Sequence, residues 1–118
     1  MKYLCLIYEK EEIFARLTPD ESQNLMREYF TFGDDIRNSG HYIAGQALQP
    51  VSTATTVRVR GGKVQSTDGP FAETKEQLGG FYMIEAKDLN DAIQVAARIP
   101  AARTGCVEVR PIMTFDRS

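Results

Sequence analysis

The chain has 118 residues, of which 42% are hydrophobic and 25% are charged, and its formal net charge is -2. These values are typical of one folded globular domain, here residues 1–118, and they exclude disordered, collagen-like and membrane-spanning compositions. Because 14 basic side chains nearly balance 16 acidic ones, no broad cationic surface is expected. We therefore expect neither nucleic acid nor a membrane as a partner.

The start of the chain does not have the pattern of a secretory signal. The apolar run YLCLIY is short, and four charged residues follow it at positions 9–12, where a signal peptide would still be apolar. Cys5 and Cys106 lie in apolar, strand-like runs without metal-ligand spacing, so we expect both to be buried free thiols. This cysteine usage favours a reducing cytoplasm.

The first half of the chain predicts a strand, a helix and a second strand. The apolar run in residues 2–8 is typical of a central strand buried on both faces. Thr18, Pro19 and Glu21 form a helix start with a capping box, and Gly40 ends the helix. A second strand over residues 41–48 follows. The apolar face of the helix carries Leu25, Tyr29, Phe32 and Ile36 at helical spacing.

Residues 55–67 predict a hairpin that turns at Gly61–Gly62, because two glycines suit the primed turns of tight hairpins. This turn sets the register. The expected pairs are Arg60 with Lys63, Val59 with Val64, and Arg58 with Gln65. One face would then carry valines and the other polar side chains, so we expect the hairpin to be half exposed.

The second half repeats the strand, helix and strand order. Residues 78–86 form a buried strand, with a bulge expected at Gly79–Gly80. Asp88 caps a helix that Pro100 ends. Residues 106–113 form the last strand, and Pro111 places it at a sheet edge or marks its end.

This order predicts an α+β fold of the ferredoxin-like, split βαβ kind, with an inserted β-hairpin. Both helices would cover one face of the sheet. The runs YLCLIY and FYMI project apolar side chains to both faces, so the other face needs a cover. A second copy of the chain is the simplest one, and we expect a homodimer.

The segment TDGPFAETKEQLGG, residues 67–80, combines a turn signal with ionisable side chains. With ALQPVSTATTVRVR at residues 47–60 and RIPAARTGCVEVRPIM at residues 98–113, it resembles the DGPF branch of the YCII-related proteins, a bacterial group. The motif that gives the branch its name is present at residues 68–71. The resemblance implies a ferredoxin-like subunit that pairs into a dimeric α/β barrel.

The resemblance also bears on function. The wider family is described as having a His-Asp pair in a small pocket, but no agreed reaction. Counted from Gly40, the histidine position holds Tyr29, and counted from Gly45, the aspartate position falls near Val51. The resemblance therefore implies that the pair is absent here. Members of the branch are often encoded beside extracytoplasmic-function sigma factors, which implies a link to regulation.

Five residues are candidates for a site. Asp68 either builds the turn through backbone hydrogen bonds or presents a catalytic carboxylate. Tyr29 either packs in the core or exposes its hydroxyl at a pocket edge. The loop residues would bind a ligand or be solvated. Ligand-binding candidates are Tyr29, Asp68, Phe71, Glu73 and Lys75.

Other polar residues have structural interpretations as well. His41 directly follows the helix end, so we expect a capping or surface role. Arg58, Arg103 and Arg110 would either converge on an anion or keep half-exposed strands soluble. The sequence contains no metal-ligand spacing and no cofactor motif, so no metal and no cofactor are expected.

Two functions stay open, and the residues do not decide whether the protein is an enzyme. One is a dimeric protein that binds a small molecule or catalyses cofactor-independent acid-base chemistry. The alternative is a regulatory module that binds a protein linked to extracytoplasmic-function sigma factors. A cavity that holds Asp68 and Tyr29 would favour the first, and an exposed apolar patch over a solid core would favour the second.

Overall fold

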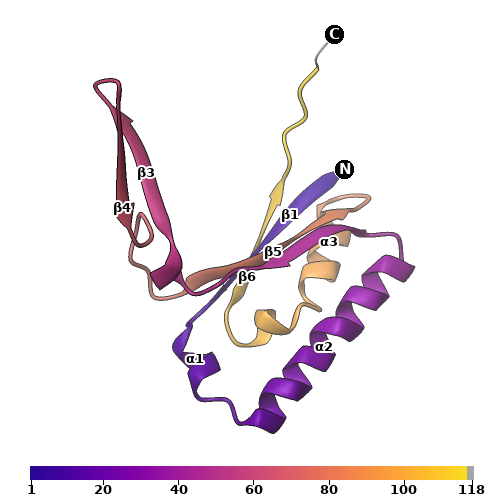
Figure 1. Ribbon diagram of the computed structural model, residues 1–118. Helices are drawn as coiled ribbons and strands as arrows, with labels where there is room; N and C mark the ends of the chain where they lie inside the picture. Colours follow the sequence, from indigo (N-terminus) through magenta and orange to yellow (C-terminus); the bar gives the residue numbers. More distant parts are fainter. Residues whose placement is uncertain (117–118) are drawn as a thin grey trace.

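A computed structural model describes residues 1–116. The main sheet has four antiparallel strands in the order β2-β5-β1-β6. They are β1 (Lys2–Glu9), β2 (Tyr42–Ala47), β5 (Gln77–Glu85) and β6 (Cys106–Pro111). Helices α2 (Pro19–Asn38) and α3 (Leu89–Ala96) lie on the same side of this sheet (Figure 1). This arrangement confirms the predicted α+β, ferredoxin-like fold.

The inserted hairpin forms a separate two-stranded sheet of β3 (Thr55–Arg60) and β4 (Lys63–Asp68). Its register pairs Arg60 with Lys63 and Val59 with Val64, as predicted. Gly61 and Gly62 at the turn have φ of 58° and 76°, values that glycine adopts without steric cost. The hairpin projects from the sheet on the side opposite the helices (Figure 1).

The exposure of the hairpin differs from the expectation. Val57, Val59 and Val64 are 60%, 57% and 74% exposed, so the valine face is uncovered rather than half buried. The reason is that the hairpin diverges from the main sheet and contacts no helix layer in its own chain (Figure 1).

Strand β1 alternates between the two faces of the sheet. Tyr3, Cys5 and Ile7 are buried under the helices with Ile36 of α2 and Ile84 of β5. On the opposite face, side chains of β1 and β5 are only half buried, because no element of the chain covers them. The half-buried apolar side chains there are Leu4, Leu6, Phe81 and Met83.

The helix ends follow the sequence signals. Thr18 and Glu21 form the predicted capping box of α2, and the Asp88 carboxylate caps α3 by accepting a hydrogen bond from the Asp91 amide. The predicted bulge in β5 is present, since the pairing with β1 shifts between Ile7 and Tyr8 where Gly79 is skipped.

Several boundaries were predicted incorrectly. Helix α3 ends at Ala96, and Pro100 begins a 3-10 helix, η2 (Pro100–Arg103), instead of ending α3. The last strand ends at Pro111 instead of residue 113. The prediction for Pro111 itself is confirmed, because β6 is the edge strand of the sheet and residue 111 is its end. The short α1 (Glu12–Ala15) and η1 (Val51–Thr53) were not predicted, because neither is long enough to show a period. No helix within residues 1–116 is long and apolar enough to span a membrane.

We expect Gly105→Ala to lower the free energy of unfolding by at least about 2 kcal/mol. A Cβ at position 105 would lie 2.0 Å from the carbonyl oxygen of Tyr8 and 2.7 Å from Cγ of Glu9, so β1 and β6 would have to separate. Gly79→Ala is the control, because a Cβ there meets nothing within 4 Å, and it should change stability by less than about 1 kcal/mol. Urea unfolding measures both variants, and equal losses would contradict this account.

Candidate functional site

A cleft of about 740 Å³ lies between α2 and the helix-covered face of the sheet. It is formed where β1 and β2 end and β5 begins, and α1 contributes Phe14 to its lining. The volume is in the range of small-molecule sites, about 300–1,000 Å³. Most of the lining is apolar, so the few polar groups in it determine which ligands fit.

Glu9 is the buried acid of this cleft. It is the last residue of β1 and is only 7% exposed, because it continues the inward-facing series of Tyr3, Cys5 and Ile7. The hydroxyl of Thr104 donates a hydrogen bond to Oε2 of Glu9. A carboxylate so removed from water needs such partners, since burial without them is costly.

Tyr29 of α2 also lines the cleft. Burial, followed by the negative charge of Glu9, raises the pKa of Tyr29 to about 12. Burial also raises the pKa of Tyr82, whose ring packs edge-on against Phe32 with centroids 5.1 Å apart. Both phenols therefore keep their protons at neutral pH and can donate hydrogen bonds.

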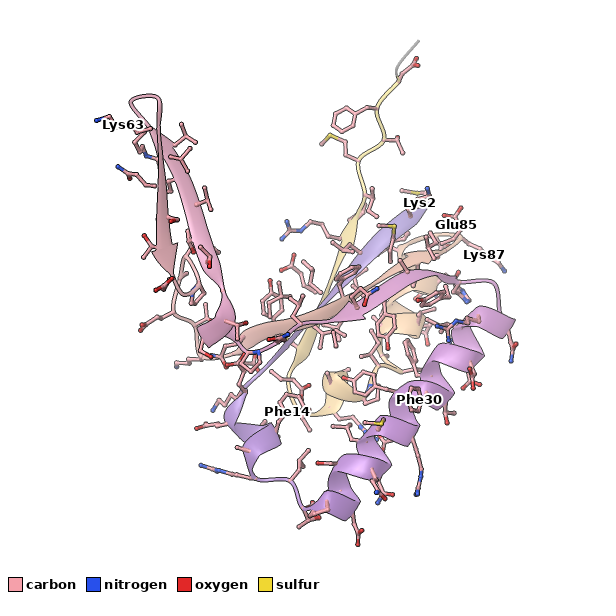
Figure 2. The ribbon with its side chains drawn as sticks, viewed as in Figure 1. Lys2, Phe14, Phe30, Lys63, Glu85 and Lys87 are labelled. Carbon is pink, nitrogen blue, oxygen red and sulfur yellow. The ribbon has the colours of Figure 1, made fainter. Side chains whose placement is uncertain are left out.

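The mouth of the cleft is formed by Glu11, which makes two hydrogen bonds there, and by apolar side chains. Oε2 of Glu11 accepts a hydrogen bond from the Val51 amide at 2.8 Å, and the Glu11 amide donates to Oε1 of Gln77 at 3.0 Å. These bonds join the end of β1 to η1 and β5. Phe14 and Phe30 belong to the lining but stay 45% and 66% exposed, and both lie on the helix side of the sheet (Figure 2).

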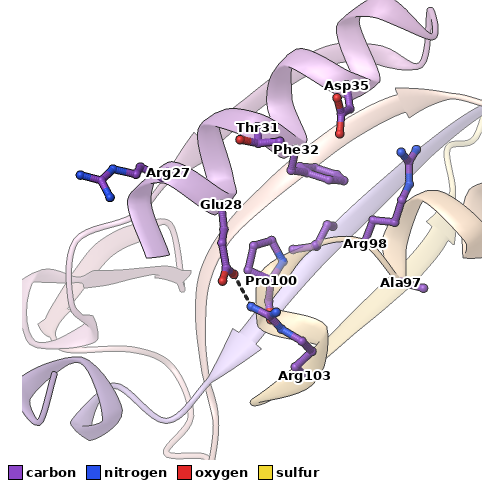
Figure 3. Close-up of a pocket in the computed structure, with 10 residues that line it drawn as sticks. Arg27, Glu28, Thr31, Phe32, Asp35, Ala97, Arg98, Pro100 and Arg103 are labelled. Atoms are coloured by element: carbon purple, nitrogen blue, oxygen red, sulfur yellow. Dashed lines mark hydrogen bonds and ion pairs between the residues drawn. The ribbon is translucent and has the colours of Figure 1, made fainter. Parts of the chain in front are cut away.

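A second hollow of about 560 Å³ lies between α2 and the segment that includes η2. Glu28 and Arg103 form an ion pair across it (Figure 3), and both side chains are largely exposed. Its floor includes Phe32, Ile99 and Pro100, which are buried members of the protein interior. All of its charged side chains are exposed, so this hollow, unlike the cleft, has no buried charged group to select a ligand.

The chain matches the YCII-related domain over residues 1–116. It is also 34% identical over 117 residues to an uncharacterized protein of Rhizobium meliloti (strain 1021), with 98% of this chain and 94% of the relative covered. The chain belongs to the YCII-related domain family. Assignment to the DGPF branch of that family stays a prediction.

Tyr29, at the expected histidine position of the YCII-related family, lies in the cleft. Val51, near the expected aspartate position, lies in η1, where its amide binds Glu11. Both positions are thus beside the same cleft, although neither carries the histidine or aspartate of the pair named in the resemblance. Sequence reasoning missed Glu9, because it begins the charged run at positions 9–12 that follows the apolar residues of the first strand. The signal that could have found it is the alternation of β1, which places position 9 on the buried face.

The structure places the other four predicted site residues outside the cleft. Asp68 ends β4, and its carboxylate makes no hydrogen bond within residues 1–116. Backbone atoms hold this turn instead: the Gly69 amide donates to the Ala54 carbonyl at 2.7 Å, and the Thr56 hydroxyl donates to the Gly69 carbonyl at 2.8 Å. Phe71, Glu73 and Lys75 are exposed in the loop that follows.

The histidine and the three arginines considered in the sequence do not lie together at one site. His41 bridges two helix ends, with Nδ1 at 2.7 Å from the Ser39 hydroxyl and Nε2 at 3.1 Å from Asp91, so it is a partly buried link rather than a surface residue. Arg103 pairs with Glu28, Arg110 pairs with Glu108, and Arg58 lies on the hairpin. Across residues 1–116, no three His, Cys, Asp or Glu side chains are placed to hold a metal ion.

The two cysteines have different environments. Cys5 is buried as predicted, and burial raises its pKa to about 11. Cys106 is exposed, so the prediction of a second buried thiol was wrong. It lies on the outer face of the edge strand β6, opposite Tyr8, where no helix covers it. Loss of solvation, and then the negative charges of Glu76 and Glu108, raise the pKa of Cys106.

We expect Glu76→Gln to speed the alkylation of Cys106 by iodoacetamide at pH 8. The reactive form is the thiolate, and removing the negative charge 3.6 Å from Sγ lowers the thiol pKa, so more thiolate is present. Glu73→Gln is the control, since Glu73 lies in the same loop without contacting the thiol. Mass spectrometry follows the two cysteines separately. Equal rates for both variants would contradict the assigned cause of the pKa shift.

Proposed function

We propose that the protein is a homodimer that binds a small organic molecule in the cleft between α2 and the sheet. The observation that carries this proposal is Glu9, a carboxylate only 7% exposed at the end of an aromatic cleft. Burial of a carboxylate is costly unless its oxygens are compensated. Such residues gather at functional sites.

The polar groups of the cleft would suit acid-base chemistry without a cofactor. Glu9 offers a hydrogen-bond acceptor, and Tyr29 offers a phenol that keeps its proton. Their closeness is reflected in the effect of the Glu9 charge on the pKa of Tyr29. A ligand held between them meets an acceptor and a donor together, which is the minimum for proton transfer to and from a bound molecule.

Two phenylalanine substitutions test whether the cleft is the ligand-binding site. Phe30→Ala should weaken any ligand found by a metabolite thermal-shift screen at least tenfold, because Phe30 lines the cleft. Phe71→Ala is the control, because Phe71 is 81% exposed outside the cleft, and it should leave affinity unchanged. Both side chains are largely solvated, so neither change should unfold the protein. Binding lost only with Phe71→Ala would move the site to the loop, and no ligand in the screen would overturn the proposal.

Surface area supports the dimer. The chain exposes 8676 Å², whereas a compact monomer of 13.2 kDa exposes about 6,400 Å². The excess of about 2,300 Å² is larger than the roughly 800 Å² that each partner buries in a standard interface. The apolar surface open to a partner includes the valine face of the hairpin, the helix-free face of the sheet, and Met113 and Phe115 near the end of the described chain, which are 73% and 78% exposed.

The hairpin has the length to clasp a second copy. Its six-residue strands span about 20 Å, while packed sheets lie about 10 Å apart. Since the hairpin rises on the helix-free side, with Lys63 at its far tip (Figure 2), it would pass the edge of a second sheet stacked there. An isolated two-stranded hairpin is only marginally stable in water, so packing on a partner would also stabilise the hairpin itself.

We expect light scattering to give twice the 13.2 kDa chain mass, and Val59→Glu to shift the protein toward monomer. A charge in the middle of the valine face would be desolvated on dimerisation. Arg58→Glu is the control, because residue 58 projects from the opposite face of the same strand, and it should stay dimeric. A monomeric wild-type protein would contradict the proposal and leave the valine face to a different protein, as in the regulatory alternative. A Val59→Glu dimer would remove the hairpin from the interface.

A further inference from the structure

The charges that line the cleft do not cancel. Its lining includes the carboxylates of Glu9, Glu11 and Asp34, but Arg37 is the only cationic side chain among the described residues that form it. Arg37 is already engaged: its Nη1 lies 3.9 Å from Asp34, and its guanidinium carbon lies 4.2 Å from the centre of the Tyr42 ring. Glu9 and Glu11 are therefore left without a cationic partner.

Glu9 presents a free oxygen to the cleft. Oε2 accepts the hydrogen bond from Thr104, whereas Oε1 makes no hydrogen bond within residues 1–116. No fully buried side-chain oxygen in that range lacks a partner, so Oε1 is not sealed off, and Glu9 lines the cleft. A desolvated carboxylate oxygen is best compensated by a cation that also donates a hydrogen bond.

The walls are suited to the same kind of ligand. Five aromatic side chains line the cleft on the helix side of the sheet, namely Phe14, Tyr29, Phe30, Tyr42 and Tyr82. Ring faces attract cations, and the Arg37–Tyr42 contact shows that this interaction already occurs at the cleft. Tyr29 and Tyr82 stay neutral, so they add donors without adding charge. An anionic ligand would instead be repelled by two unpaired carboxylates.

We propose that the cleft is specific for an organic cation, an amine with an aromatic or similarly bulky apolar body whose ammonium group binds Glu9. This inference rests on the proposed function, and it adds the ligand class. The ammonium donates to Oε1 of Glu9, and the apolar body lies among the rings. Phe14 and Phe30 at the mouth become covered when the ligand is present.

Three probes with one ring system test the ligand class by calorimetry on the wild-type protein. Tryptamine carries an ammonium group, 3-ethylindole is neutral, and indole-3-propionate carries a carboxylate. We expect tryptamine to bind at least tenfold more tightly than 3-ethylindole, and indole-3-propionate to bind most weakly. Equal or tighter binding of either of the other two probes would overturn the inference while leaving the cleft as a ligand site.

A substitution of Glu9 tests whether this residue causes the preference for the ammonium probe. Glu9→Gln keeps the shape and an oxygen for Thr104, and it should weaken tryptamine at least tenfold without changing 3-ethylindole. Glu12→Gln is the control, because Glu12 is exposed and lies outside the cleft lining. Unchanged tryptamine affinity in Glu9→Gln would overturn the role of Glu9. If the variant fails to fold, the order of the three probes on the wild-type protein still decides the ligand class. Absence of binding by all three overturns the inference alone, because the metabolite screen judges the proposed function separately.

Discussion

The placement of one carboxylate among apolar side chains is the constraint on which this structure depends. Strand β1 directs alternate residues under the helices, and at its last position that residue is Glu9. The Thr104 hydroxyl compensates part of the cost of desolvation. That contact requires the chain to turn closely past Tyr8 and Glu9, and only a glycine fits at position 105. The start of β6 is thus shaped around the acid. Had position 9 been apolar, the cleft would be a simple continuation of the protein interior.

A second constraint comes from the one-sided arrangement of layers. Both long helices lie on one face of the four-stranded sheet (Figure 1), and the uncovered face carries leucine, phenylalanine and methionine side chains. The hairpin and residues 112–116 project on that same side (Figure 1). The chain is therefore extended for its size: its radius of gyration is 16.6 Å, whereas a compact chain of this length has about 13.5 Å. In a dimer, the helix-free face and the hairpin would both be buried against the second copy. In an isolated chain, each would leave apolar surface exposed to water.

The sequence predicted the topology because each element of it carries a strong local signal. The capping box at Thr18, the two glycines at the hairpin turn and the bulge at Gly79 all appear where expected. The sequence did not predict the features that depend on tertiary contacts. Pro100 begins η2 rather than ending α3, and the valine face stays uncovered because the hairpin leaves the sheet, which no local pattern encodes. The site was harder to predict. Tyr29 was found from its place on the helix, but Glu9 was hidden in a charged run, and the prominent motif at residues 68–71 lies on the surface away from the cleft.

The chemistry of the cleft follows from which of its groups can change charge. A phenol with a pKa of about 12 does not lose its proton at neutral pH, so Tyr29 can donate a hydrogen bond but cannot act as a base. Histidine, the usual group for proton transfer near neutral pH, is absent from the cleft, since His41 is held between two helix ends. Proton acceptance therefore falls to the carboxylates of the lining, of which Glu9 is the buried one. A ligand that brings its own positive charge satisfies that acid without any proton being moved, and this favours recognition of a cation as the primary role of the cleft, with proton transfer as an addition that a suitable substrate would have to supply.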